Sequence, residues 1–310
     1  MKKGIFIFFV FMLVLACRKS APALSAATPA FAPSAEFTAY WNAGVAELAR
    51  YDLTQARYGN LHRGEMLAIV VAEPFRSDKQ VKADQTPQSA DMAVLKAQLM
   101  RRFATGIYDY AMTTTSFKPL NAAVQVPAIK VTGSSVDWCG HTWLQLNFRK
   151  DGYAAQGRSY FEESADENFE LPAAVSEDEI WQRIRMAPQS LPVGKVQVIP
   201  SMISSRLRHR RLAAEQASAE LQTSGALKQS EYSLVYDAGL PTERKVAFVF
   251  ENIFPHKILE FQETYMDGFK NPKKLTTVAR LKKTVRSAYW QEHNPEHAKL
   301  RREFGVTGAN

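Results

Sequence analysis

The chain has 310 residues, of which 46 % are hydrophobic and 23 % are charged, and its formal net charge at pH 7 is +8. This composition is ordinary for a globular protein, and the length is sufficient to bury a substantial core. The basic excess suits anionic lipid head groups or acidic glycans. Binding of nucleic acid is not expected, because no nucleic-acid-binding motif occurs.

The N-terminus has the form of a secretion signal. Basic residues precede an apolar run over residues 5–15, and Ala16 comes directly before Cys17. The run is too short to span a membrane, which takes about 20 apolar residues. We therefore predict a signal peptide over residues 1–16.

Cys17 is the predicted lipidation site. Residues 13–17, Leu-Val-Leu-Ala-Cys, resemble the lipobox of bacterial lipoproteins, in which the cysteine is acylated and becomes the first residue of the mature chain. The alternative is an ordinary signal peptide followed by an incidental cysteine. An Asp after the cysteine would favour the inner membrane under the enterobacterial sorting rule. This chain has Arg18 instead, so we expect a lipid-anchored protein of the cell envelope, on the periplasmic face of the outer membrane.

The mature chain divides into a tether and a folded part. Residues 17–36 are rich in Ala, Ser and Pro, which predicts a flexible tether behind the acylated cysteine. Residues 37–310 are expected to form a single β-rich periplasmic domain. Cleavage after residue 16 removes two lysines, so the formal charge falls from +8 to +6. An acylated Cys17 would also leave Cys139 without an intrachain disulfide partner.

Apolar periodicity predicts strands along most of the chain. A helix comes first, over residues 37–48, where the apolar residues have helical spacing. Residues 94–103 favour a strand because β-type segments flank them, although helix propensity is also good there. The other predicted strands are residues 67–72, 107–117, 128–132, 136–148, 153–161, 195–199, 231–236, 245–250 and 257–265.

Turn signals separate several of these strands. Gly133, with two serines after it, is expected to form a turn between two strands, and Asp151-Gly152 predicts a hairpin. Residues 206–221 are assigned to a strand because apolar and polar residues partly alternate, with a helix as the alternative that propensity suggests.

Cap residues mark the remaining helices. Ser176 and Glu179 form a capping box for a short helix that ends before Pro188. Further helices are expected over residues 278–289 and 295–304, the second with an N-terminal Asn-Pro pair.

The order of elements predicts the fold. Consecutive strands joined by short turns indicate an antiparallel meander rather than a parallel sheet. Curling lets a long meander cover one apolar face and hide its edges. The predicted fold is mainly β, in the α+β class: a long antiparallel meander forming a curved sheet, half-barrel or barrel, with short flanking helices. A β-sandwich is the alternative.

The densest set of reactive side chains comprises Cys139 and His141, with Trp138 and Trp143 beside them. Residues i and i+2 of a regular strand lie about 6.5–7 Å apart, whereas a catalytic pair needs hydrogen-bond contact. A bulge at Gly140 could shorten that gap. We therefore favour a small cysteine packed in the core and keep a thiol-dependent enzyme centred on this pair as an alternative.

The sequence gives less support for a metal site or for the paired carboxylates of a glycosidase. A metal at Cys139 and His141 would need further ligands from His256, His293 or His297, and no zinc-type spacing occurs. We predict no metal and no cofactor. The acidic residues of the segment 162–167 lie in a loop, which is a poor place to hold two carboxylates across a cleft. These acidic residues are Glu162, Glu163, Asp166 and Glu167.

A run of basic side chains, Arg206, Arg208, His209, Arg210 and Arg211, is either a solvated face or a site for phosphate or carboxylate groups. The candidate ligand-binding residues are Trp138, Trp143, Arg208 and Arg210.

Several blocks of the sequence carry a family resemblance. They are Tyr40-Trp41 with Gln55–Gly59 and Lys79–Asp84, then Phe103 with Thr105–Tyr108, Asp137–Thr142, Asp178–Arg185 and Phe254–Leu259. These blocks resemble a family of uncharacterised bacterial lipoproteins, largely of Bacteroidota type, often labelled septum formation inhibitor Maf. The motifs of Maf nucleotide pyrophosphatases do not stand here in the right context. The resemblance implies a lipoprotein and carries no established reaction.

These observations favour a membrane-anchored periplasmic lipoprotein that binds an apolar or amphipathic envelope molecule without catalysis. The alternatives are the thiol-dependent enzyme and a scaffold for envelope proteins. The expected partners are the membrane, through Cys17, and a lipid or an anionic envelope glycan.

Overall fold

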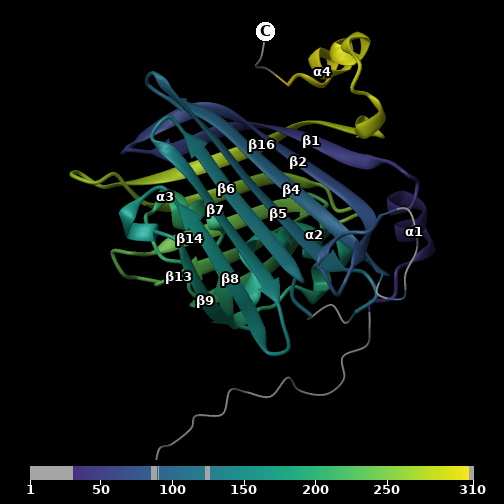
Figure 1. The fold of residues 1–310 in the computed structure, drawn as a ribbon, viewed down its shortest axis with the longest axis horizontal. Helices are drawn as coiled ribbons and strands as arrows, with labels where there is room; N and C mark the ends of the chain where they lie inside the picture. The colour runs from purple at the N-terminus through teal and green to yellow at the C-terminus, as the bar shows by residue number, and fades with distance from the viewer. Residues whose placement is uncertain (1–30, 85–88, 90, 123–125, 307–310) are drawn as a thin grey trace, which may run out of the picture.

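The computed structural model describes residues 31–84, 89, 91–122 and 126–306 (Figure 1). The predicted signal peptide, Cys17 and most of the predicted tether lie outside these residues. The contacts of the folded part join residues between 31 and 306. The predicted mature chain, which begins at residue 17, therefore retains all of them. Within the described residues, no helix has both the length and the apolar character needed to cross a membrane.

The fold is mainly β and is built on a 16-stranded sheet. The first half of the chain supplies β1 Ala46–Arg57, β2 Asn60–Arg76, β3 Val81–Lys82, β4 Asp91–Thr105, β5 Tyr108–Pro119, β6 Lys130–Asp137, β7 Gly140–Phe148, β8 Gly152–Ser159 and β9 Glu167–Pro172. The second half supplies β10 Val175–Ser176, β11 Gly194–Ile199, β12 Glu215–Ser224, β13 Gln229–Tyr236, β14 Arg244–Glu251, β15 Ile258–Asp267 and β16 Lys273–Ser287.

The helices are short. The α-helices are α1 Ala35–Trp41, α2 Ile180–Met186, α3 Met202–Leu207 and α4 Ala298–Phe304. Single 3-10 turns occur at Glu162–Ser164, Glu177–Glu179, Pro188–Ser190, Tyr289–Gln291 and Pro295–His297.

Two meanders join to make the sheet. The strand order is β10-β11-β12-β13-β14-β15-β16-β1-β2-β4-β5-β6-β7-β8-β9, with β3 paired to β2, so the last strand lies beside the first. Neighbours are antiparallel apart from β10 and β11. The order runs from one edge to the other without closing, and the sheet curves so that its two arms face each other across α2 and α3 (Figure 1). This arrangement confirms the predicted curved meander, in its open form.

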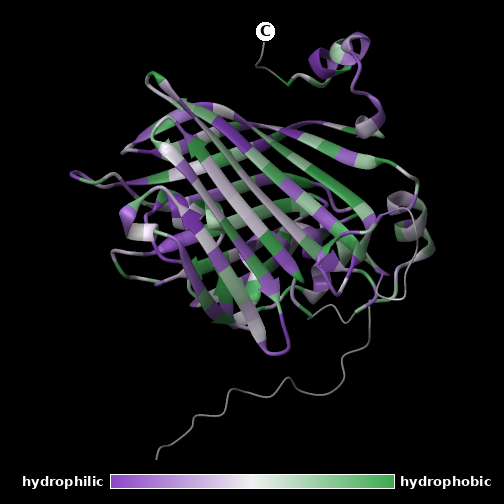
Figure 2. Cartoon of the chain, in the orientation of Figure 1, coloured by the Kyte–Doolittle hydropathy of each residue, from purple (hydrophilic) through white to green (hydrophobic). Residues whose placement is uncertain are grey.

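The concave face of the sheet is filled by α2. Ile180 and Ile184 are one helical turn apart, and both are fully buried in the main core. The ring of Trp181 lies 5.9 Å from that of Tyr51, on β1, and 5.6 Å from that of Phe248, on β14. Hydrophobic and hydrophilic residues alternate along many strands (Figure 2), as expected when one face of a sheet is covered.

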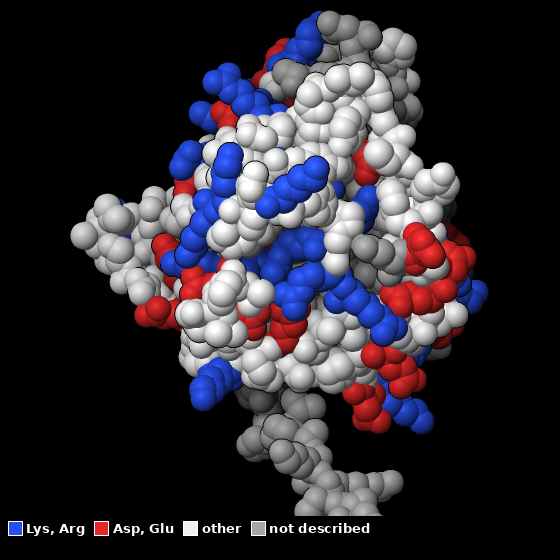
Figure 3. Space-filling model, turned by 90° about the vertical axis from the view of Figure 1, so that its left-hand side faces the viewer, with Lys and Arg blue, Asp and Glu red and all other residues white. Residues whose placement is uncertain are grey.

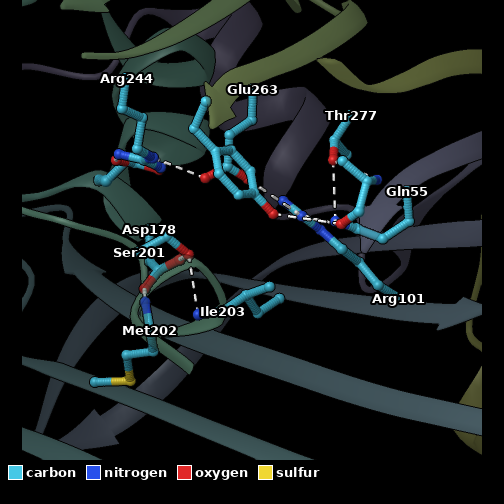
Figure 4. A network of polar contacts seen from close by, with 12 residues as sticks. Gln55, Arg101, Asp178, Ser201, Met202, Ile203, Arg244, Glu263 and Thr277 are labelled. Atoms are coloured by element: carbon cyan, nitrogen blue, oxygen red, sulfur yellow. Dashed lines mark hydrogen bonds and ion pairs between the residues drawn. The ribbon is translucent and has the colours of Figure 1, made fainter. Parts of the chain in front are cut away.

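Charged residues also lie inside the molecule, in pairs. Arg244, which is 1 % exposed, binds both oxygens of Glu177 at 2.7 and 2.6 Å, and its Nε donates to Glu263 at 2.7 Å. Arg101 contributes a second cation 3.8 Å from Glu263. Figure 4 shows this network together with the neighbouring contacts of Asp178. Buried charges of this kind are tolerated only when they are paired.

Two predicted helices are corrected by the structure. The helix expected over residues 278–289 is wrong, because β16 runs through Ser287 and pairs with both β1 and β15. The first helix ends at Trp41, and the residues from Ala46 onward belong to β1 rather than to that helix. The C-terminal helix over residues 295–304 is confirmed as a 3-10 turn followed by α4.

Two predicted boundaries also differ. The turn expected at Gly133 is absent, because β6 continues through it to Asp137, and the hairpin lies at Trp138-Cys139. The strand predicted over residues 206–221 begins only at Glu215, after the end of α3 and an irregular segment.

Candidate ligand-binding site

The basic run follows α3, whose position is set from inside the molecule. Asp178 accepts hydrogen bonds from the Ser201 hydroxyl at 2.7 Å and from the Met202 backbone N–H at 3.1 Å, which ties the start of α3 to the interior. Burial raises the pKa of Asp178 to about 6. On its other side α3 packs against β5 and β6, and a Cβ at Gly133 would lie 2.7 Å from the Met202 sulfur. A glycine therefore lets α3 approach the sheet closely.

One end of the sheet brings many turns together. Because the strands are antiparallel, the turns that follow β1, β4, β6, β8, β13 and β15 all lie at the same end, which we call the turn end. A hydrogen bond of 2.6 Å from Gly59 N–H to the Asp267 carboxylate joins two of these turns. Residues 206–211, which we call the arginine segment, also lie here. Figure 3 views this side of the molecule and shows Lys and Arg side chains across its middle.

The first cavity at the turn end has a volume of about 260 Å³ and carries several cations. We call it the anion cavity, because Arg57, Arg208 and Arg210 all line it. Tyr265 and Phe269 provide aromatic surface beside these side chains. Guanidinium groups bind carboxylates and phosphates through paired hydrogen bonds, so this arrangement can hold an anionic group.

Arg57 is the most unusual of these cations, because it is only 3 % exposed. Its Nη1 donates to the Leu207 carbonyl at 2.6 Å, and its Nη2 lies 3.3 Å from the hydroxyls of Tyr58 and Tyr110. Its Nε has no hydrogen-bond partner. Among the described residues, no carboxylate lies within ion-pair distance of Arg57. A buried charge without a counter-charge is costly, so an anion in the cavity would be stabilised.

Arg208 adds a second cation of this kind. Its side chain is half-buried over the ring of Tyr265, 5.7 Å from the ring centre. Burial, and then repulsion from Arg244, lower the pKa of Arg208. Within the part of the chain that the structure describes, Arg208 has no ion pair within 4 Å. A bound anion would offset both effects.

The second cavity is mainly apolar and lies between α3 and the concave face of β5 to β8. Its volume is about 130 Å³. We call it the apolar cleft. Apolar side chains that line it are Met112, Leu144, Phe161, Met202, Ile203 and Leu212. Arg210 lines both this cleft and the anion cavity, so the two cavities adjoin.

The other cations of the arginine segment are already engaged. Arg206 donates to Asp137 at 3.4 Å and stacks 4.3 Å from the ring centre of Phe161. Arg211 pairs with Glu167 at 2.9 Å. Arg210 lies 3.6 Å from Glu215, in a partly exposed pair that contributes little energy. The acidic residue Glu167 therefore serves as an ion-pair partner on β9.

The structure separates Cys139 and Trp138 from these cavities. Both residues are exposed at the turn between β6 and β7. The expectation that Cys139 packs in the core is therefore wrong. Its backbone N–H donates to Asp137 at 2.8 Å, and the other oxygen of this carboxylate binds Arg206. His141 is also exposed, on β7.

Trp143 borders the apolar cleft without pointing into it. Its neighbour Leu144 pairs with Gly133, which lies directly under α3 on the concave face. Side chains alternate along a strand, so the indole of Trp143 points to the convex face. Of the candidate ligand-binding residues, the structure brings together Arg208 and Arg210, leaves Trp143 at the border of the apolar cleft and leaves Trp138 outside both cavities.

The histidines considered as metal ligands are dispersed. His256 lies 3.1 Å from the Glu251 carbonyl, near the opposite end of the sheet. His293 contacts the Trp290 carbonyl, and His297 accepts a hydrogen bond from Asn294. Among the described residues, no group of three or more His, Cys, Asp or Glu side chains could hold a metal ion.

Arg57 is the principal residue that the sequence did not indicate. It stands alone between Ala56 and Tyr58, at the end of a strand, and its burial depends on Leu207 and Tyr110 from distant parts of the chain. In the sequence, Arg57 is marked only by its place in the block Gln55–Gly59 and by the glycine at the end of this block, which stands in a turn where Tyr58 and Gly59 both have a positive φ.

No family model, no curated protein and no solved structure matches this chain.

Proposed function

We propose that this protein is a lipid-anchored protein of the cell envelope that binds an amphipathic anion at the turn end, without catalysis. The observation that carries the proposal is the pair of adjoining cavities, one lined by arginines and the other by apolar side chains, with Arg210 on both. The head group would meet Arg57, Arg208 and Arg210, and an apolar group would enter the cleft beneath α3.

The sizes of the cavities support a ligand that is only partly enclosed. Pockets that enclose a drug-sized molecule have volumes of about 300–1,000 Å³, whereas these cavities measure about 260 and 130 Å³. Because α2 fills the rest of the concave face, the cavities cannot enclose a long apolar chain. A charged head group and a short apolar portion fit this description better.

The residues before the folded part support the location. The lipobox-like segment that ends at Cys17 provides an anchor, and Arg18 favours the periplasmic face of the outer membrane. Mass spectrometry of the N-terminal peptide tests this part of the proposal. An acylated Cys17 at the N-terminus supports it, and an uncleaved or unmodified N-terminus contradicts it.

Binding can be measured with a defined probe, a dansylated medium-chain fatty acid, with its methyl ester as the uncharged comparison. The chain from residue 17, with Cys17→Ser, should bind the acid more tightly than the ester. The double variant Arg208→Gln/Arg210→Gln should weaken binding of the acid by about tenfold or more, because hydrogen bonds to charged groups contribute about 1.5–3 kcal/mol each. Binding of the ester should change little.

The matched control is Arg280→Gln. Arg280 pairs with Glu260 on an exposed part of β16, away from both cavities. This variant should keep the affinity of the original chain for the acid. The proposal fails if the chain binds neither probe, or if Arg208→Gln/Arg210→Gln binds the acid as well as the control does.

A further inference from the structure

The tips of the turns at the turn end carry large apolar side chains that solvent reaches. Each of the turns that follow β1, β4, β6, β8, β13 and β15 has one such residue, and their exposed fractions range from 36 % to 80 %. In sheet order they are Leu240, Phe269, Tyr58, Ile107, Trp138 and Tyr160. We call this set the tip row. Exposed apolar residues scattered singly are normal, but a continuous group marks an interaction surface.

Contacts between neighbouring turns connect much of the tip row. The ring centre of Tyr58 lies 5.9 Å from that of Phe269 and 6.5 Å from that of Tyr108. Tyr108 in turn lies 6.4 Å from Trp138. Tyr160 closes over Gly140, where an added Cβ would come within 2.7 Å of its ring. The side chains therefore support one another across five adjacent turns.

Lys and Arg side chains lie behind the tip row, and several of them pair with acidic side chains at the same end. The arginine segment and Arg57 lie between the tips, and Lys270 is exposed directly after Phe269. In Figure 3 the Lys and Arg side chains run across the middle of this side, and many of the acidic side chains lie towards its edges. Tyr and Trp side chains, with an apolar body and a polar tip, favour the boundary between lipid and water.

We infer that the turn end docks on an anionic lipid surface, with the tip row entering the head-group region and the arginines facing the lipid phosphates. Surfaces that combine exposed aromatic or apolar residues with cations bind anionic membranes in this way. This inference goes beyond the proposed ligand binding, because docking needs no bound ligand. It also places both cavities against the bilayer, where an amphipathic molecule could pass between membrane and protein.

The test uses vesicles and the unanchored chain from residue 17 with Cys17→Ser. Flotation with vesicles of phosphatidylethanolamine and phosphatidylglycerol should recover the chain. Vesicles of phosphatidylcholine should recover at most about one tenth of that amount of protein. Added salt should release it, because screening weakens attraction between surface charges. Failure to bind the anionic vesicles overturns the inference, even if the turn end binds a protein partner.

Matched variants distinguish the tip row from general stickiness. Ile107→Ser/Trp138→Ser should lower the vesicle partition coefficient by about tenfold, since both side chains would leave the head-group region. Leu227→Ser/Ile253→Ser removes residues of similar exposure, 69 % and 63 %, from the opposite end and should leave partition unchanged. Equal losses from both variants overturn the inference.

The exposed thiol of Cys139 gives a second measurement. An environment-sensitive dye at Cys139 should shift to the blue on anionic vesicles and be quenched by nitroxide-labelled lipids. The same dye at Lys150→Cys, with Cys139→Ser, reports the opposite end of the sheet and should show neither effect. A dye at Cys139 that stays unquenched on bound vesicles contradicts the proposed orientation.

Ligand binding and docking can fail separately. Neither Ile107 nor Trp138 lines a cavity, so the variant that loses vesicle binding should keep its affinity for the dansylated fatty acid. Loss of vesicle binding with intact probe binding identifies the tip row as the docking surface. If the chain binds the probe but does not bind vesicles, the proposed function is supported and docking is refuted.

Discussion

Replacing Arg244 with methionine should strongly destabilise the fold. Arg244 forms two hydrogen bonds with Glu177, at 2.7 and 2.6 Å, and one with Glu263, at 2.7 Å. It also stacks 5.0 Å from the ring centre of Tyr236. Methionine fills a similar volume but brings no charge, so Arg244→Met leaves two buried carboxylates without their main cation.

The magnitude follows from burial. Arg244, Glu177 and Glu263 are each at most 2 % exposed, so water cannot replace the lost contacts. Removing one partner of such a pair typically costs about 3–5 kcal/mol. This is a large part of a total stability of about 5–15 kcal/mol. We therefore expect the free energy of unfolding at pH 7 to fall by about 3–5 kcal/mol.

The pH dependence gives a second, independent check. Burial alone would raise the pKa of Glu263, but Arg244 and then Arg101 hold it below the ordinary value. A depressed carboxyl pKa contributes stability above the unfolded pKa of about 4.3 and loses it as the pH falls. Without Arg244, Glu263 should take up a proton more readily. The destabilisation by Arg244→Met should therefore be greatest near pH 7 and shrink towards pH 4.

Urea unfolding followed by circular dichroism measures both effects. The matched control is Arg280→Met, which breaks an Arg–Glu pair of similar length, 2.6 Å, whose arginine side chain is 63 % exposed. This variant should cost at most about 1 kcal/mol. The reasoning is refuted if Arg244→Met costs no more than the control, or if its cost grows as the pH is lowered.

Two further predictions concern a buried lysine and a buried glycine. Burial lowers the pKa of Lys118 to about 7. Between pH 7 and 9.5 the unfolded chain therefore binds one more proton at this lysine than the folded chain, and the free energy of unfolding should rise with pH. In urea titrations Lys118→Met should remove most of this rise, and an unchanged slope would contradict the lowered pKa. Gly133→Ala should cost about 1–3 kcal/mol and weaken binding of the dansylated fatty acid, because the added Cβ would meet Met202 at 2.7 Å and push α3 away from the sheet. Gly225→Ala, where a Cβ meets nothing within 4 Å, should do neither, and equal thermal shifts in the two glycine variants would rule out the close approach of α3.

Local patterns predicted most of the strands because burial on one face imposes a period of two. The longer strands that they missed are β1, β9 and β16. In β16, residues 278–289 combine good helix formers with many charges. Its strand form depends on pairing with β1, as in the contact between Leu48 and Val285, and on pairing with β15. Neither partner can be inferred from the residues of β16, so intrinsic propensity gave the wrong element.

The candidate site was predictable only in part. Arg208 and Arg210 stand in an obvious basic run with Arg206 and Arg211, and all of these except Arg208 lie within ion-pair distance of an acidic residue. Which arginines remain available depends on tertiary contacts. Arg57 has no neighbouring basic residue to mark it, and its burial arises from the way α3 ends above β1.

The pairing of β1 with β16 has a consequence for how the chain reaches this structure. The Tyr51 hydroxyl binds the Ile258 carbonyl across 207 positions, and Gln55 binds Thr277 across 222. A nascent polypeptide emerges N-terminus first, so β1 must wait for nearly the whole chain before its second neighbour exists. Such high contact order slows folding and leaves a strand edge open in the interval. The sheet is therefore completed only when the last strand arrives.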